Sequence, residues 1–239
     1  MASTFSTDLK LEIVATGEKA GLWGTITNTN LQILEQSASG YQDIDMAGAS
    51  VTLLLSDGAT SNGKNFYLKL SGTLAGDRTL TMPSGSERVW IISDETVRGG
   101  SNRTLSVLTA SGTSQPVPPG ATLLCVSDGT NTTTRIIEKG YATITDSNSP
   151  YAAVAGAQIF ANTTANPIEI DLPSSPAVGD EITIIDTRGT FASNNLTIDR
   201  NGQPINTGTS NLVLNTNGQA ITLVYVDATR GWAFKTNTA

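Results

Sequence analysis

The chain has no histidine, one cysteine, few aromatic residues and few charged ones. Of its 239 residues, 5% are aromatic and 15% are charged, and the formal net charge is −7 at pH 7. Without histidine, Ser-His-Asp and Cys-His catalysis and histidine-ligated zinc are excluded, together with the commonest general base near neutral pH. We therefore expect a non-enzymatic protein with no catalytic residue, no cofactor and no metal.

A single cysteine, Cys125, excludes an intrachain disulfide, and its place in the run ATLLCVS predicts a small buried residue of a strand. Clusters of Lys and Arg are also lacking, so we expect no nucleic acid and no anionic membrane surface as partner. The start, MASTFSTDLK, lacks the regions of a secretory signal, and no apolar run approaches the ~20 residues that cross a bilayer. The sequence thus predicts synthesis as a soluble protein in a cytoplasm.

Threonine, serine, asparagine and glycine are abundant instead, a composition typical of turn-rich β structure. Short apolar runs recur after residue 41, separated by segments rich in Gly, Ser, Asp and Pro. In the first half, we predict strands over residues 51–55, 66–70, 79–82, 88–93, 103–108, 121–127 and 134–138. In the second half, we predict strands over residues 157–160, 168–172, 181–186, 196–199, 212–214, 220–226 and 232–235.

The second series of strands repeats the first. Four pairs of segments correspond: TLTMP with EIDLP, VWIISD with TIIDTR, RTLSVL with NLTIDR, and LLCVSDGT with LVYVDAT. The offset between them grows along the chain because loops tolerate insertions. Pro83 and Pro173 follow equivalent strands and mark their ends, since proline cannot donate to a strand ladder.

These patterns predict an all-β protein in which an N-terminal strand and one short helix precede two tandem, related, antiparallel β-sandwich-like domains. The expected parts are an attachment arm over 1–40, a first β domain over 41–140 and a second over 141–239. Trp90 and Trp232 lie in strands, where we expect them to pack in or over their domains, with sugar stacking as the alternative. The runs LLCV and ITLVYV are nearly unbroken, which predicts strands buried on both faces. The opposite sheet of the same domain would cover one face, and a second copy of the chain is one candidate for covering the other.

Paired carboxylates remain open as catalytic groups, because they can hydrolyse glycosidic bonds without histidine. The candidates are Asp94, Glu95, Asp128, Asp186 and Asp227. Each lies at a strand end beside Ser, Gly or Thr, where an aspartate usually accepts hydrogen bonds from its own turn. We interpret them as turn residues. The oxygen-rich run DSNS is too short to specify a calcium site.

The stretch GEKAGLWGTITNTNLQILEQSASG differs from the rest of the chain and predicts its one helix. Thr25, Thr27 or Asn28 can cap the helix start by accepting a bond from a backbone N–H, and Gly40 can end it with a positive φ. The apolar residues between them have helical spacing over about 10 to 12 residues. So short a helix is marginal alone in water and needs cover, either from the chain's own first β domain or from another chain.

Before this helix, Leu9 and Leu11 alternate with charged residues and predict a strand with one apolar face, which pairs with its own sheet or with a neighbouring subunit. Together with Trp23, Leu31 and Leu34 they are our candidates for an attachment or intersubunit surface. For Trp23 we expect first a staple-like contact that holds the helix entry. A direct interface anchor is the competing role, since buried aromatic residues dominate binding hot spots.

The run LKLEIV, followed by TGEKAGLWG and TNTNLQIL, resembles the N-terminal module of tail-fibre and other virion structural proteins of tailed phages. The resemblance covers residues 1–40, with its Gly, Trp-Gly and Asn-x-Asn before Leu, and extends to the β domains only in style. Such modules usually lie at the virion-proximal end of a trimeric appendage. The resemblance implies a structural protein of the virion that forms a homotrimer, binds other virion proteins through its N-terminal region and presents its β domains outward.

Within that class, a tail fibre or tail-associated appendage would reach a host surface glycan through loops of the second domain. A capsid decoration or capsid fibre protein is the alternative, because the chain is short and lacks coiled-coil heptads, β-helix periods and collagen-like triplets. A carbohydrate-binding module is a further alternative, which predicts a planar set of exposed aromatic residues. A depolymerase would require the carboxylates named above.

Overall fold

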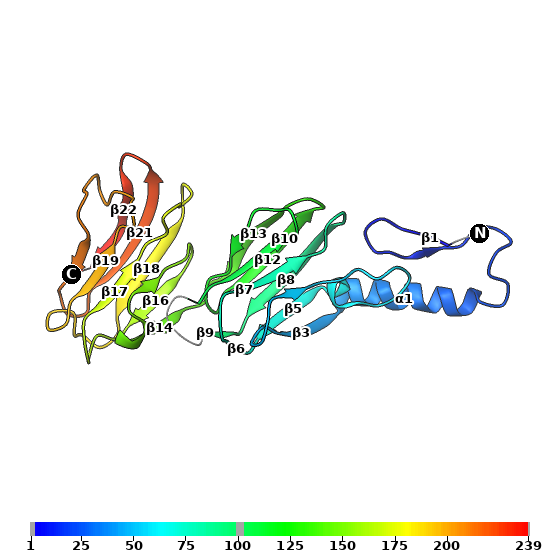
Figure 1. The fold of residues 1–239 in the computed structure, drawn as a ribbon, viewed down its shortest axis with the longest axis horizontal. Coiled ribbons are helices and arrows are strands. Elements are labelled where there is room, and N and C mark those ends of the chain that lie inside the picture. The colour runs from blue at the N-terminus through cyan, green and yellow to red at the C-terminus, as the bar shows by residue number, and fades with distance from the viewer. Residues whose placement is uncertain (1–2, 99–102, 239) are drawn as a thin grey trace.

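The computed structural model describes residues 3–98 and 103–238, which form a mostly β protein with one α-helix. Three parts follow one another along the long axis, with the N-terminus at one end and the C-terminus in the part at the other (Figure 1). We refer to residues 3–40 as the arm, to the described residues of 41–138 as the first β unit, and to residues 142–238 as the second β unit.

The arm consists of a two-stranded hairpin beside a helix. β1 (Thr4–Phe5) pairs antiparallel with β2 (Glu12–Ile13), and α1 (Trp23–Ser39) follows. The helix is 17 residues long, longer than the sequence predicts, because it begins upstream of the predicted caps. Its N-cap residue is Leu22, which makes no side-chain capping bond, so the prediction of a Thr or Asn cap is wrong.

Gly40 ends α1 for a reason other than the one predicted. Its φ is −65°, which any residue can adopt, so no left-handed conformation is needed. A Cβ at this position would instead overlap the carbonyl oxygen of Gln36 and lie 2.6 Å from Oδ1 of Asn65. Glycine is required because the chain passes close to these atoms.

Two sheets build the first β unit. Its elements are β3 (Tyr41–Asp45), β4 (Val51–Thr52), η1 (Asn62–Lys64), β5 (Tyr67–Ser71), β6 (Thr73–Leu74), β7 (Arg78–Met82), β8 (Glu87–Asp94), β9 (Val97–Arg98), β10 (Leu105–Thr109), β11 (Gln115–Pro116), β12 (Thr122–Asp128) and β13 (Thr132–Glu138). The five-stranded sheet has the order β13-β12-β8-β5-β3, and the four-stranded sheet has the order β11-β10-β7-β4. The short strands β6 and β9 pair with each other.

The second β unit has the same two-sheet plan. Its elements are β14 (Ala142–Ile144), η2 (Asp146–Asn148), β15 (Tyr151–Ala152), β16 (Gln158–Ala161), β17 (Ile168–Asp171), β18 (Glu181–Asp186), β19 (Leu196–Asp199), β20 (Leu212–Leu214), β21 (Ala220–Asp227) and β22 (Gly231–Thr238). The five-stranded sheet has the order β14-β16-β18-β21-β22, and the four-stranded sheet has the order β15-β17-β19-β20. The sequence did not predict β3, β14 or β15, which begin the sheets of their units.

In both units the chain passes back and forth between the two sheets, so that neighbouring strands of a sheet are parallel. β3, β5 and β8 are parallel in one sheet, and β4, β7 and β10 are parallel in the other. The second unit repeats this pattern, and antiparallel partners occur only among the last strands of each sheet. This is the winding of a short solenoid, and the predicted antiparallel sandwich is wrong.

The physical reason for this error lies in the connections. A period of two in side-chain burial identifies a strand but does not say which strand lies beside it. Here the parallel neighbour within a sheet is two or three strands away along the chain, and an intervening strand in the opposite sheet serves as part of the crossover that parallel pairing requires. The few coils have loops of unequal length, so no solenoid period is visible in the sequence.

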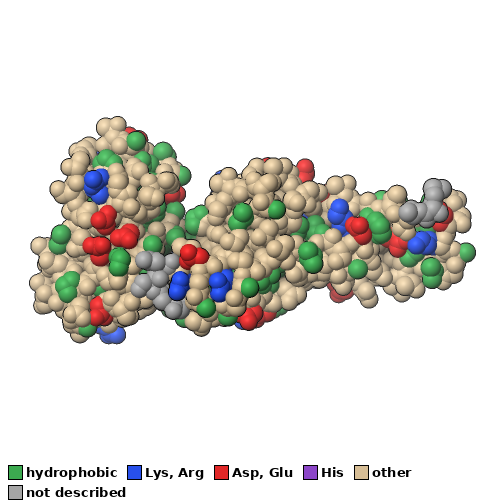
Figure 2. All heavy atoms as spheres, in the orientation of Figure 1, with side chains coloured by type: hydrophobic (Ala, Val, Ile, Leu, Met, Phe, Trp, Pro, Cys, Tyr) green, Lys and Arg blue, Asp and Glu red, His purple; other side chains and the backbone are tan. Residues whose placement is uncertain are grey.

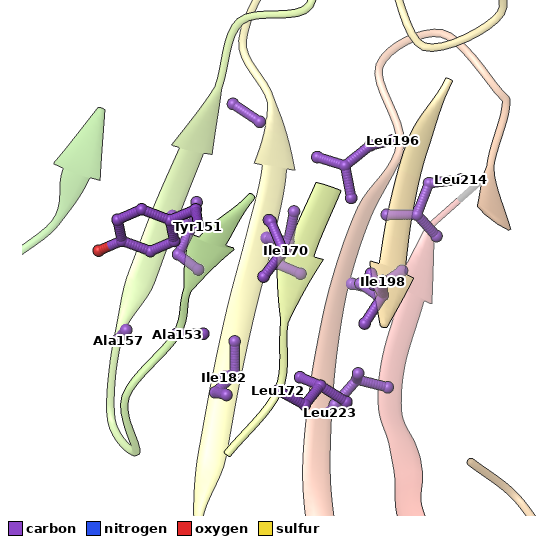
Figure 3. Packing of buried hydrophobic residues seen from close by; sticks show 14 of the residues in the cluster. Tyr151, Ala153, Ala157, Ile170, Leu172, Ile182, Leu196, Ile198, Leu214 and Leu223 are labelled. Carbon is purple, nitrogen blue, oxygen red and sulfur yellow. The ribbon is translucent and has the colours of Figure 1, made fainter. Parts of the chain in front are cut away.

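Each unit has its own core between its two sheets. Trp90 and Cys125 are fully buried in the first core, and burial raises the pKa of the Cys125 thiol to about 12. Trp232 and Phe191 are fully buried in the second core, part of which is shown in Figure 3. The predictions that Trp90 and Trp232 pack within their units and that Cys125 is a buried strand residue are confirmed.

The prediction that LLCV and ITLVYV form strands buried on both faces is wrong. In β12, Leu123 and Cys125 point into the core, whereas Leu124 is half-buried and Val126 is 41% exposed on the opposite face. β21 likewise alternates between buried and half-buried residues. The outer face of each five-stranded sheet is therefore open in the single chain.

A candidate intersubunit surface on the arm

The hairpin of the arm is fixed at both ends by hydrogen bonds. Asn30 on α1 accepts a bond from the backbone N–H of Glu12 and donates one to its carbonyl oxygen, both at 3.0 Å. At the other end, Oδ1 of Asp8 accepts a bond of 2.9 Å from the backbone N–H of Glu87 at the start of β8. The hairpin is thus attached to both the helix and the first β unit.

Leu9 and Leu11 lie in this hairpin, and both are half-buried there. The predicted strand through them is reduced to the two residues of β2, because Lys10 has a φ of 56°, in the left-handed region that interrupts an extended chain. The carbonyl oxygen of Lys10 accepts a bond from the N–H of Gly58, which holds this turn against the first β unit.

The helix α1 has one covered and one uncovered apolar side. Ile26 and Ile33 are buried, at 9% and 0% exposure. Trp23, Leu31 and Leu34 are 59%, 56% and 42% exposed, and at 3.6 residues per turn they lie within roughly a quarter of the helix circumference. We call these three residues the arm stripe.

The arm stripe contains three of the five predicted surface residues. Trp23 is the first residue of α1 and is too exposed to act as a staple within this chain. Sequence reasoning missed Tyr41, which follows the helix directly and is 58% exposed. Its alternation with Asp43 and Asp45, opposite the inward Ile44, is the signal that could have placed it on an open sheet face.

The five acidic residues considered for catalysis make structural bonds. Asp128 and Asp227 each accept two backbone N–H groups of their own turns, and Asp94 accepts backbone N–H groups and an arginine. Glu95 forms an ion pair with a lysine at 3.1 Å. Burial raises the pKa of Asp186, but bonds from four backbone N–H groups outweigh burial and hold that pKa below its ordinary value. The turn interpretation is confirmed for the four aspartates.

An open groove of about 770 Å³ lies between the two β units. It is lined by β11, β13 and residues of the loops 153–156 and 173–181. Nζ of Lys139 lies 3.8 Å from Oε2 of Glu181, and Lys235 also forms an ion pair with Glu181. Glu181 at the groove thus pairs with two lysines at once.

Among residues 3–98 and 103–238, no three or more carboxylate or cysteine side chains gather as they would around a metal ion. No helix in these ranges has the length and apolar character to span a membrane.

The chain matches no protein-family model and no curated protein. Among solved structures it is similar to a chain described as "Structure of a chaperone-substrate complex", with 14% sequence identity and a TM-score of 0.37. That similarity covers 82% of this chain and 32% of the other, so the chain spans about a third of its length. A likeness at this level supports no statement about function.

Proposed function

We propose that the chain is a non-enzymatic structural protein of a bacteriophage particle, a tail fibre or tail-associated appendage. In this proposal the arm joins copies of the chain into a homotrimer and attaches them to other virion proteins, while the β units extend outward. The observation that carries the assembly part is the arm stripe, whose Trp23, Leu31 and Leu34 are uncovered in the single chain. The resemblance of residues 1–40 to phage appendage modules supports the location in a virion.

Helices that pack around a symmetry axis bring the same residues of each copy together. Thr27 and Ala38 lie on the same side of α1 as the arm stripe, so this side repeats as Trp23, Thr27, Leu31, Leu34 and Ala38, close to the spacing of a coiled-coil seam. Covering a large apolar side chain contributes roughly 1.5–3 kcal/mol when it is fully exposed beforehand. The arm stripe therefore supplies a driving force for association that the single chain does not use.

The β units are, in this proposal, the outward part. We infer that they are related repeats, because their strands follow the same order through both sheets. Their polar loops, those of the second unit above all, would be available to a host surface glycan. The protein would be made in the cytoplasm of the infected host and then incorporated into the particle.

A capsid decoration or capsid fibre protein is the alternative location for the same assembly. Antibody labelling of purified particles separates the two locations by electron microscopy. We expect the antibody label over the tail. Label over the shell would reject the tail location in favour of a capsid protein.

The assembly itself is tested by Leu31→Asp with Leu34→Asp, measured by light scattering after size exclusion. Charges placed in an apolar contact lose their water at a cost of several kcal/mol, so we expect β-rich monomers in place of oligomers. Asn28→Asp with Gln32→Asp is the matched control, because these exposed positions lie off the arm stripe and should leave the oligomer intact. An unchanged oligomer in the leucine variant would contradict the proposal.

A further inference from the structure

A second apolar surface lies on the outer face of the five-stranded sheet of the first β unit. Strand register places Tyr41, Tyr67, Ile91 and Leu124 side by side across β3, β5, β8 and β12. Val89 and Val126 form the neighbouring pair. We call these residues the sheet patch: Tyr41, Tyr67, Val89, Ile91, Leu124 and Val126.

The sheet patch is open to solvent in the single chain. Tyr41, Val89 and Val126 are 58%, 42% and 41% exposed, and the other members are half-buried. The rings of Tyr41 and Tyr67 stack with their centres 5.5 Å apart, which gives the patch a flat aromatic edge. Such a surface is typical of a contact with another protein chain.

The fold itself does not require an apolar face here, as the second β unit shows. Asp94 and Asp186 occupy equivalent positions, since each accepts a bond at Oδ2 from the N–H of an equivalent glycine, Gly120 at 3.2 Å and Gly218 at 3.0 Å. With the two aspartates and the two glycines aligned, the strand register gives the other equivalent positions. They are Tyr67 and Gln158, Ile91 and Thr183, and Leu124 and Thr222.

In the second unit, the outer row is thus polar where the first unit is apolar. The hydroxyl groups of Thr183 and Thr222 lie 3.0 Å apart and bond to each other. The same winding therefore accepts either an apolar or a polar row at these positions, and the second unit has apolar residues in the next row instead, where Phe160 pairs with Ile185 and its ring stacks on Tyr141. The apolar row of the first unit needs an explanation outside the fold of the unit.

The sheet patch lies next to the arm. Tyr41 follows Gly40, at which α1 ends, and the strand β8 that carries Val89 and Ile91 begins at the bond between Glu87 and the arm. In Figure 2, hydrophobic side chains occur on the arm and on the adjoining end of the first β unit. The next row of the sheet, farther along β3 from the arm, is polar, with Asp43 beside Lys69.

The area of the arm stripe is small for a stable assembly. A large aromatic side chain buries roughly 150–250 Å² in full, so three partly exposed apolar residues offer roughly 300–400 Å². Specific interfaces bury about 800 Å² on each partner. The assembly therefore needs further surface, and the sheet patch begins at Tyr41, directly after the helix that carries the arm stripe.

Charge also favours a second copy as the partner. Copies of a chain with a net charge of −7 repel each other, so a contact between them should lie where charges are absent or compensated. No member of the sheet patch is charged. Lys69 at its border forms ion pairs within the chain, 3.5 Å from Asp43 and 3.1 Å from Glu95.

We propose that the sheet patch continues the intersubunit surface of the arm and is covered by a second copy of this chain. The proposal rests on the assembly described under the proposed function and names the part of the β structure that takes part in it. It assigns the first β unit to assembly and leaves the outer sheet face of the second unit free.

The test replaces the central row by the residues that the second unit carries at the same positions: Tyr67→Gln with Ile91→Thr and Leu124→Thr. These residues are compatible with the winding, so the variant should keep its far-UV circular dichroism. Light scattering over a dilution series measures the concentration at which the oligomer dissociates into monomers. We expect that concentration to be at least tenfold higher for the variant than for the wild type. Val126→Lys is the second variant, and Val224→Lys, at the equivalent position of the second unit opposite Glu181, is its control, expected to leave association unchanged.

The possible results separate this proposal from the proposed function. If the row variant and Val126→Lys associate like the wild type while Leu31→Asp with Leu34→Asp gives monomers, the sheet patch is not an interface, and assembly through the arm stands. A wild-type chain that is monomeric at all concentrations would overturn both. Equal weakening by Val126→Lys and Val224→Lys would also overturn the sheet patch, because it would show a general effect of added charge.

Discussion

The two β units wind in the same way, yet they present different outer faces to solvent. Inward residues such as Leu123 and Ile221 are buried in both, and Asp94 and Asp186 cap equivalent turns. The outward residues at equivalent positions differ in polarity. Ile91 lies beside Leu124 in the first unit, whereas Thr183 bonds to Thr222 in the second. The comparison separates residues that build the winding from residues that are free to serve a partner.

The first unit also contains a buried lysine beside the loop that contacts the arm. In the first unit Lys64 is fully buried, and its Nζ donates to the carbonyl oxygens of Ser56 and Ala59 at 2.7 and 2.5 Å. Burial, with the nearby charge of Arg88, lowers the pKa of Lys64 to about 8. These bonds tie down the loop that receives the turn of the hairpin at Gly58. The first unit is thus built to hold the arm as well as to form its own core.

The largest effect is expected from shortening one large buried side chain in each core, which tests whether the two cores are independent. Trp90→Ala and Trp232→Ala should each destabilise their own unit by about 3–5 kcal/mol, because each leaves a cavity in a fully packed interior. Scanning calorimetry should show that each variant lowers one unfolding transition and leaves the other in place.

Trp23→Ala is the control for this pair, since Trp23 is 59% exposed and touches neither core in the single chain. It should leave both transitions unchanged under monomeric conditions. If Trp90→Ala lowered both transitions equally, the two units would unfold as one body, and their treatment as separate structures would fail.

A smaller effect is expected at the equivalent turn aspartates. Asp186→Asn should cost about 1–3 kcal/mol at pH 7, because it replaces one carboxylate oxygen by an amide NH2 group, which cannot accept the two backbone N–H bonds that this oxygen accepts. Those backbone bonds hold the native pKa of Asp186 below its value in the unfolded chain, so its stabilisation is present above the unfolded pKa and is lost as the pH falls through the native one.

Thermal unfolding at pH 7 and near pH 3 checks this sign. The wild type should lose stability on acidification while the Asn variant loses less, so that the difference between them shrinks. Asp94→Asn is the matched variant and should affect the transition of the first unit alone. A difference that is the same at both pH values would show that the charge of Asp186 contributes nothing.

Strand positions could be predicted from the sequence because they depend on local alternation. The run from Glu181 to Asp186 alternates between half-buried and buried residues, and the structure has the strand at the predicted bounds. Strand partners could not be predicted, because parallel pairing depends on which sheet each connection enters. Gly40 and Lys10 show the same limit at single residues: one is needed for a close approach to Asn65 and the other adopts a positive φ, and neither is visible in local pattern.

For the candidate site, the sequence indicated which helix residues are apolar but not which side of the helix is covered. Ile33 and Leu34 are neighbours in the chain, yet one is fully buried and the other is 42% exposed. At 3.6 residues per turn, Ile33 lies between Asn30, which bonds to the hairpin, and Gln36, which accepts a bond from the N–H of Ser61 in the first β unit. The sheet patch was missed for a related reason, because β3 was not predicted and its outward Tyr41 had no place in a sheet.

The smallest effect is expected from giving the second unit the outer residues of the first. Thr183→Ile with Thr222→Leu removes one hydrogen bond between half-buried hydroxyl groups and adds an apolar contact, so the two changes nearly cancel. We expect the unfolding transition of the second unit to shift by less than about 1 kcal/mol in free energy. Made in the Leu31→Asp with Leu34→Asp background, the variant can be measured without assembly through the arm. A large loss of stability would mean that the threonine row is part of what builds the winding, and the separation between fold residues and partner residues would not hold for this face.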